Sequence, residues 1–282
     1  MNITGDLRYV HPGEYAAFET RSSERLLEDY YERVVAFRRQ QAPDYEPTKA
    51  DREAWFEAHP PGFIEHRQHW HPQGEIGSWV LEHATMIRIN DTLFVHGGLG
   101  ERMHGLSLEE INARVREELS DVRAAPQPLF IESPDGPLWH RGLSHRPGES
   151  SAADAEEVTR LLESFGAERI VLGHTPGYGT VMPRYDGRVL LADTGISSAY
   201  GGYVAAVLIE GGEAFTLQAG ERIAIPMSDQ ELLPYLRRVA GLLPRPTTML
   251  ETLIAAIETG GPGVIYPDAD DGATVTGEDA ME

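Results

Sequence analysis

The 282-residue chain carries 24 Lys and Arg against 45 Asp and Glu, which gives a formal net charge of −21, and it contains no cysteine. The negative charge argues against a nucleic-acid backbone as partner, because phosphate contacts need clustered Lys and Arg. The absence of cysteine excludes disulfides, thiolate metal sites and cysteine nucleophiles, so any metal must bind His, Asp, Asn or Glu. With 41% hydrophobic and 24% charged residues, the composition is that of a globular protein.

The sequence contains no stretch that approaches the roughly 20 apolar residues of a membrane span; the best run, residues 203–209, has the length of a strand. The opening residues, MNITGD, lack the basic and apolar regions of a signal peptide. We therefore expect a cytoplasmic protein with no membrane partner. Residues 261–282 are expected to form a disordered acidic tail, because they cannot bury enough apolar surface to offset their ordering entropy.

Helical spacing of apolar residues, with capping residues before it, predicts helices in the first part of the chain over 22–40, 48–60 and 75–83. Ser22 and Ser23 precede the first of them. Thr48 and Asp51 have the spacing of a capping box at the start of the second. We interpret about residues 11–83 as a helical insertion.

The pattern changes after residue 84. Short apolar runs predict strands over 85–89, 92–95, 169–172, 189–192, 203–209 and 214–217. The first two flank Asn90 and Asp91, which is a hairpin signal. Further helices are predicted over 107–119, 153–165, 228–241 and 247–257. Helices mixed with short strands that end in polar residues predict an α/β sandwich with its chemistry at the strand ends.

Two of the eleven histidines follow predicted buried strands directly. His96 comes after Leu-Phe-Val and before two glycines, and His174 comes after Ile-Val-Leu-Gly and before Thr-Pro-Gly. A strand fixes the direction of the side chain, and the small residues leave room for a metal and substrate oxygens. For either histidine alone, capping of a strand is the simpler interpretation, but two such positions in one chain favour a site.

The segments around these histidines, INDTLFVHGGL (89–99) and VLGHTP (171–176), resemble the last two metal-ligand motifs of the phosphoprotein-phosphatase branch of the calcineurin-like metallophosphoesterases. The pattern is most similar to the bacterial Shewanella-like phosphatases. Supporting segments are 74–81, GPLWHRG (136–142) and LADTG (191–195). The resemblance covers most of residues 1 to about 215.

This resemblance implies an α/β fold, the calcineurin-like metallophosphoesterase β-sandwich flanked by helices, here N-terminally truncated and with the helical insertion. The implied organisation is a metallophosphoesterase domain over 1–225, C-terminal helices over 226–260 and the acidic tail. Losing the first elements of a sandwich exposes a sheet edge, so we expect the chain made alone to be marginally soluble or oligomeric.

The family's first three metal motifs, Asp-x-His, Gly-Asp-x-x-Asp-Arg and Gly-Asn-His-Glu, do not occur in the sequence. The opening MNITGDLRY resembles the stretch that follows Asn-His-Glu in the bacterial group, so we interpret Met1 as an internal methionine of the family pattern. By the resemblance, His96 and His174 bind one divalent ion of manganese, iron or zinc, whereas the ligands of a second ion and the catalytic histidine belong to the upstream motifs. Two histidines fall short of the three protein ligands that are usual for catalytic zinc.

Arg141, in the segment between the two histidine motifs, is the candidate for gripping substrate, because a guanidinium suits bidentate contact with phosphate oxygens. A surface arginine in an ion pair is the alternative, and the resemblance favours phosphate. Tyr178 and Tyr200, each beside glycines in strand-end loops, either line the site or pack in the interior.

Two further patterns have simpler interpretations. His66, His69 and His71 form an H-x-x-H-x-H cluster that could ligate a metal, but it lies in a polar, Pro-flanked segment, and we interpret it as a solvated helix end. Asp193-Thr194-Gly195 resembles the aspartic-protease triplet. That chemistry needs two carboxylates sharing a proton, and the chain has one copy.

The resemblance therefore implies a metal-dependent phosphatase that hydrolyses phosphate monoesters. Its substrate is expected to be a phosphorylated protein, on phosphoserine, phosphothreonine or phosphotyrosine, or a small phosphomonoester. His96 and His174 are the predicted metal ligands and Arg141 the phosphate clamp. The alternative is a non-catalytic pseudophosphatase remnant that acts as a binding module. Presence or absence of the upstream motifs in the native protein separates the two.

Overall fold

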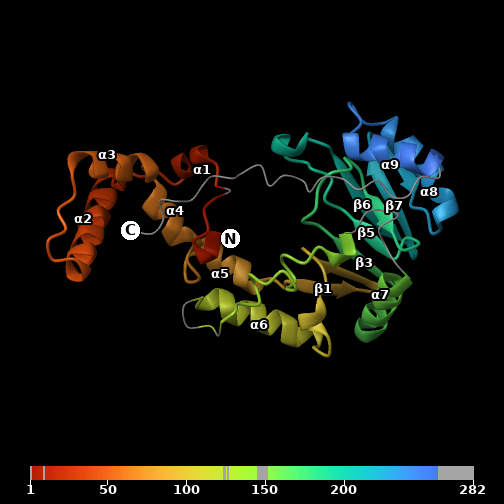
Figure 1. Ribbon diagram of the computed structural model, residues 1–282, viewed down its shortest axis with the longest axis horizontal. Coiled ribbons are helices and arrows are strands. Elements are labelled where there is room, and N and C mark those ends of the chain that lie inside the picture. Colours follow the sequence, from red (N-terminus) through yellow and green to blue (C-terminus); the bar gives the residue numbers. More distant parts are fainter. Residues whose placement is uncertain (1, 9, 123–124, 126, 145–151, 260–282) are drawn as a thin grey trace. The chain divides into compact units, whose positions relative to one another are not determined.

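The structure is a computed structural model that describes residues 2–8, 10–122, 125, 127–144 and 152–259 (Figure 1). The chain divides into two compact units. We call residues 1–84 with 113–129 the helical unit, and residues 85–112 with 130–282 the sheet unit. The tail predicted to be disordered lies outside the described residues.

The described part of the helical unit contains α1 (Pro12–Ala16), α2 (Ser23–Gln41), α3 (Lys49–Ala58), α4 (Phe63–Trp70), α5 (Glu75–Glu82) and the end of α6 (Leu108–Ser120). The predicted capping box at the start of α3 is confirmed: Thr48 Oγ1 accepts from Asp51 N at 3.2 Å, and Asp51 Oδ2 accepts from Thr48 N at 2.8 Å. The box fixes the first turn of α3 by satisfying two backbone N–H groups there.

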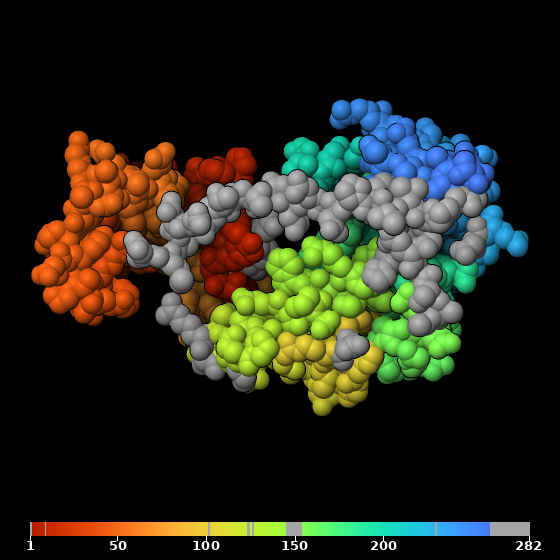
Figure 2. All heavy atoms as spheres, in the orientation of Figure 1, coloured from red at the N-terminus to blue at the C-terminus, as the bar shows by residue number. Residues whose placement is uncertain are grey.

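The predicted cap of α2 differs in detail. Ser22 is the N-cap residue, but its backbone has φ −102° and ψ −3° instead of an extended conformation, and its side chain makes no capping hydrogen bond. Ser23 Oγ instead accepts from Thr20 N at 2.8 Å. The helix then buries Leu27, Tyr31 and Val35 on one face, in agreement with the predicted spacing. Helices α2 and α3 are drawn in orange in Figure 2.

The sheet unit holds a five-stranded sheet whose strands lie in the order β1 (Met86–Ile89), β2 (Thr92–Val95), β3 (Arg169–Leu172), β5 (Val189–Leu191) and β4 (Met182–Arg184). The neighbouring strands β2, β3 and β5 are parallel, and the outer strands β1 and β4 are antiparallel to their neighbours. The predicted hairpin is confirmed, with Asn90 at φ 54° in its turn. Because β2, β3 and β5 run in one direction, their carboxyl ends meet at one edge of the sheet.

A second, antiparallel sheet is formed by β6 (Ala205–Glu210), β7 (Glu213–Gln218) and β8 (Glu221–Ala224). The two predicted closing helices are present as α8 (Asp229–Ala240) and α9 (Thr248–Thr259), drawn in blue in Figures 1 and 2. A buried hydroxyl pair fastens α8 to β7, with Tyr235 Oη 2.7 Å from Thr216 Oγ1. Tyr235 also donates to Val181 O at 2.6 Å, and burial raises the pKa of this phenol to about 12.

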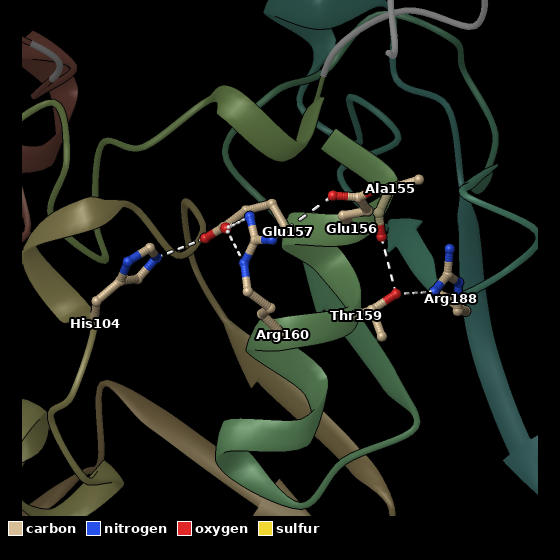
Figure 3. Close-up of polar contacts among 7 residues, drawn as sticks. All are labelled: His104, Ala155, Glu156, Glu157, Thr159, Arg160 and Arg188. Atoms are coloured by element: carbon tan, nitrogen blue, oxygen red, sulfur yellow. Dashed lines mark hydrogen bonds and ion pairs between the residues drawn. The ribbon is translucent and has the colours of Figure 1, made fainter. Parts of the chain in front are cut away.

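Helix α7 (Ala152–Phe165) connects two parts of the sheet unit through its polar face, as Figure 3 shows. Glu157 accepts from Arg160 Nη2 at 2.6 Å and also lies 2.6 Å from His104 Nε2, in the loop after β2. Thr159 Oγ1 accepts from Arg188 Nη1, just before β5, at 2.8 Å. These contacts tie the loop that follows β2 and the entrance to β5 to one rigid helix.

Within the described residues, no helix is both long enough and apolar enough to cross a membrane.

Candidate functional site

The two predicted histidines meet at the carboxyl edge of the five-stranded sheet. In the parallel register of β2 and β3, Val95 pairs with Leu172, so His96 lies opposite Gly173, whose N–H donates to His96 O at 2.9 Å. His174 follows one residue later. The two imidazole centroids are 5.0 Å apart, with the rings inclined at 63°.

The backbone at His174 adopts a conformation that side chains rarely take, with φ +68°. Left-handed conformations of non-glycine residues cost free energy and occur often at functional sites. The next residue closes a tight turn, because Thr175 N donates to Gly173 O at 2.8 Å. In the described part of the chain, the buried atoms His174 Nε2 and Thr175 Oγ1 have no hydrogen-bond partner. Unpartnered buried polar atoms such as these are groups that a water, an ion or a ligand can satisfy.

Both imidazoles are held in their neutral form at neutral pH. Burial lowers the pKa of His174 to about 4, aided by the charge of Arg141 and by His96, and opposed by Asp193. Burial also lowers the pKa of His96, again against Asp193. A metal ion binds the lone pair of a neutral imidazole, so neither histidine has to lose a proton before binding.

The fit of a metal to this pair can be judged from the ring separation. Two imidazoles that bind one ion at 2.0–2.1 Å have centroids about 4.5–5.2 Å apart for bond angles of about 90–110°. The observed 5.0 Å falls in that range. Across the part of the chain that the structure describes, no three His, Asp or Glu side chains form a metal-binding group. The separation of the rings therefore allows both imidazoles to bind one ion, and the described residues supply no third ligand.

Arg141 is an exposed residue whose charge acts on His174. The alternative interpretation was an arginine held in a surface ion pair. Among the described residues, Arg141 takes part in no such ion pair.

The structure adds two neighbours that the sequence did not single out as site residues. Trp139 lies edge-to-face with His174, at a centroid distance of 5.3 Å and an angle of 88°. Asp193 follows β5 at the same sheet edge; its charge acts on both histidines, and its Oδ1 accepts from Gly195 N at 3.1 Å. Trp139 and Asp193 both belong to segments that support the family resemblance. That membership is the feature of the sequence by which they could have been identified as site residues.

The other residues singled out in the sequence fall into two groups, buried and exposed. The interpretation of the H-x-x-H-x-H cluster as a solvated helix end is wrong for His66, which is fully buried between the rings of Tyr15 and Phe18, because α4 turns that face into the helical unit's core. His71 is exposed. Of the two tyrosines, Tyr178 is buried and Tyr200 is 58% exposed.

Known proteins resemble the chain in sequence and in fold. No family model matches the chain. An uncharacterised protein of Schizosaccharomyces pombe is 29% identical over 209 residues, which is 72% of this chain and 50% of the relative. Shewanella-like protein phosphatase 1 of Plasmodium berghei is 27% identical over 130 residues, which is 45% of this chain and 36% of the relative. The chain thus spans half or less of the length of these curated relatives.

A solved structure confirms the predicted fold class. The crystal structure of a point mutant of a cold-active protein tyrosine phosphatase matches with a TM-score of 0.52 and 23% identity, over 81% of this chain and 56% of that chain. The chain therefore has the mixed α/β fold of that phosphatase, with sheets flanked by helices.

Proposed function

We propose, on the premise that this chain is a relative of the Shewanella-like phosphatases with their phosphoesterase fold, that it takes part in metal-dependent hydrolysis of phosphate monoesters on proteins. The observation that carries the proposal is the pair of neutral imidazoles that follow adjacent parallel strands, with ring centroids 5.0 Å apart. The buried Nε2 of His174 has no hydrogen-bond partner among the described residues.

Each residue of the site has a separate role. His96 and His174 hold a divalent ion, for which manganese, iron and zinc are the candidates. When bound, such an ion supplies Lewis-acid polarisation of phosphate oxygens. Arg141 grips the same phosphate group through its planar guanidinium, which orients the ester and neutralises its charge.

A protein substrate is favoured by the loop that begins at Asp193. Two hydrogen bonds join the two ends of this loop. Thr194 Oγ1 donates to Tyr203 O at 2.7 Å, and Tyr203 N donates to Gly195 O at 3.0 Å. The closed loop exposes the apolar side chains of Ile196 (68%) and Tyr200 (58%). Exposed apolar groups next to a site suit the side chains that flank a phosphorylated residue.

Hydrolysis of an aryl phosphate and of peptides carrying phosphoserine, phosphothreonine or phosphotyrosine, with and without Mn²⁺, tests this proposal. In a protein that carries the upstream metal motifs together with this chain, the expected result is metal-dependent turnover that disappears in His174→Ala and persists in His83→Ala. The exposed His83 serves as control because it lies at the end of α5, in the helical unit. Metal and phosphopeptide binding without turnover would favour the alternative, a non-catalytic binding module.

A further inference from the structure

Trp139 reaches the site on a segment whose position relative to His96 is fixed. Gly97, directly after His96, donates its N–H to Pro137 O at 2.7 Å. A Cβ at Gly97 would lie 2.8 Å from the carbonyl carbon of Leu138, so only glycine allows the two backbones to approach this closely. The indole that follows is therefore held in register with the end of β2.

In the part of the chain that the structure describes, by contrast, no hydrogen bond orients the His174 imidazole. Its ring nitrogens make none within the described residues, and Nε2 is buried. Histidines that bind metals are usually oriented by a hydrogen bond from their second nitrogen to a carboxylate or a carbonyl. At His174 two aromatic contacts stand where such a hydrogen bond would be. The ring centroid of His96 lies 5.0 Å away with an interplanar angle of 63°, and that of Trp139 lies 5.3 Å away with an angle of 88°.

We infer that Trp139 is a positioning residue. It holds the His174 imidazole in the orientation in which His174 and His96 can bind the same metal ion. An edge-to-face aromatic contact restricts rotation about the side-chain bonds of the imidazole, as a hydrogen bond to a carboxylate does elsewhere. Because the segment of Trp139 is bonded to the turn after His96, the indole also couples the two histidines to each other. The inference rests on the proposed function only in taking His174 as a metal ligand.

The competing explanation is that Trp139 merely fills space. The two explanations differ in what a smaller aromatic ring does. A phenyl ring at position 139 retains a face and an edge for His174, whereas an aliphatic side chain fills volume and provides no aromatic contact. Trp139→Phe and Trp139→Leu are therefore the informative pair, and Trp79→Leu is the matched control because Trp79 is 59% exposed on α5.

The experiment measures Zn²⁺ affinity by calorimetry and the ¹⁵N and ¹H resonances of the imidazoles by NMR in the metal-free full chain. We expect Trp139→Leu to weaken Zn²⁺ binding about 10- to 100-fold, the range typical of groups that orient metal ligands. His174 resonances should show the averaged signature of a mobile ring, with those of His96 little changed. Trp139→Phe should stay within a few-fold of the wild type, and Trp79→Leu should match it.

Equal losses in the Phe and Leu variants, or a rigid His174 ring in Trp139→Leu, would overturn the inference. If Trp139→Leu does not fold, Trp139→Met provides the same comparison with a more adaptable aliphatic side chain. Failure of the proposed function gives a different result: no Zn²⁺ binding in the wild type. The imidazole resonances of the metal-free variants still decide the positioning role in that case.

Discussion

At the scale of single residues, His174 combines features that each cost stability. It has a left-handed backbone at φ +68°, a buried nitrogen without a partner in the described residues, and an imidazole whose pKa burial lowers to about 4. Features that lower stability persist in proteins mainly where function requires them. A residue selected for stability at this position would be glycine or asparagine, which adopt the left-handed conformation readily.

This argument gives a prediction for His174→Asn. Asparagine retains the backbone conformation and removes the imidazole, so the metal-free variant should be as stable as the wild type or up to about 1 kcal/mol more stable. The increase in melting temperature that Zn²⁺ causes should disappear. Thermal unfolding with and without Zn²⁺ measures both effects. A variant that is clearly less stable without metal and still stabilised by Zn²⁺ contradicts the assignment.

His66 gives a prediction about pH in the helical unit. Burial lowers the pKa of this fully buried imidazole below its usual 6.5, with Arg67 and His69 acting in the same direction and Glu14, 3.3 Å from Nε2, opposing. A lowered folded-state pKa means that the unfolded chain binds the proton more readily. The contribution of the neutral His66 to the free energy of unfolding is therefore fully present above about pH 6.5, and it is lost as the pH falls below that value.

The measurement is the urea midpoint at pH 7.5 and pH 5.5, followed by tryptophan fluorescence, because Trp55, Trp70 and Trp79 lie in the helical unit. The midpoint should fall at the lower pH, and His66→Phe should reduce that fall while the exposed control His83→Phe should not. An unchanged pH dependence in His66→Phe would assign the effect to other groups.

At the scale of elements, the close packing of the turn after β2 against residues 137–139 decides whether the site forms. Gly97→Ala forces a Cβ to 2.8 Å from backbone atoms of Leu138, which cannot rotate away. We expect a loss of about 1–3 kcal/mol in unfolding free energy and loss of metal binding.

Gly241→Ala is the control, because it lies after α8 with φ −67° and its Cβ would meet nothing closer than 3.5 Å. Urea unfolding and Zn²⁺ calorimetry compare the two variants. Equal stability and equal Zn²⁺ affinity in both would show that the turn and residues 137–139 move apart without consequence.

Local signals in the sequence predicted the elements that depend on local chemistry. The capping box at Thr48 and the hairpin at Asn90 were predicted because their residues bond to near neighbours. Strands β4 and β8 were missed: β4 contains Pro183 and pairs with β5, and β8 has two charged residues followed by two apolar ones, so it lacks the alternation of a half-buried strand. The burial of His66 depends on tertiary packing, which a polar local sequence does not reveal.

The same distinction between local and distant contacts applies to the candidate site. His96 and His174 could be found because each ends a strand, and the parallel register then brings them together. The contact of Trp139 with His174 could not be found, since it depends on a loop that folds back from a distant part of the sequence. A cytoplasmic location, the domain limits and the metal identity remain predictions from the sequence.

At the scale of the whole molecule, the two units should respond differently to metal. The site lies entirely in the sheet unit, so a bound ion stabilises that unit by mass action and leaves the helical unit unchanged. Hydrogen exchange should therefore slow at the amides of β2 and β3 on adding Zn²⁺, with no change in α2 and α3. Equal protection of both units would contradict a local site.

The central claim is that His96 and His174 bind one divalent ion together, and a Co²⁺ titration followed by NMR tests it most directly. We predict one Co²⁺ per chain, with strongly shifted imidazole signals from two histidines, both lost in His96→Ala and in His174→Ala. Co²⁺ that shifts the signals of other histidines, or of His96 and His174 in separate steps at different concentrations, would contradict the shared site.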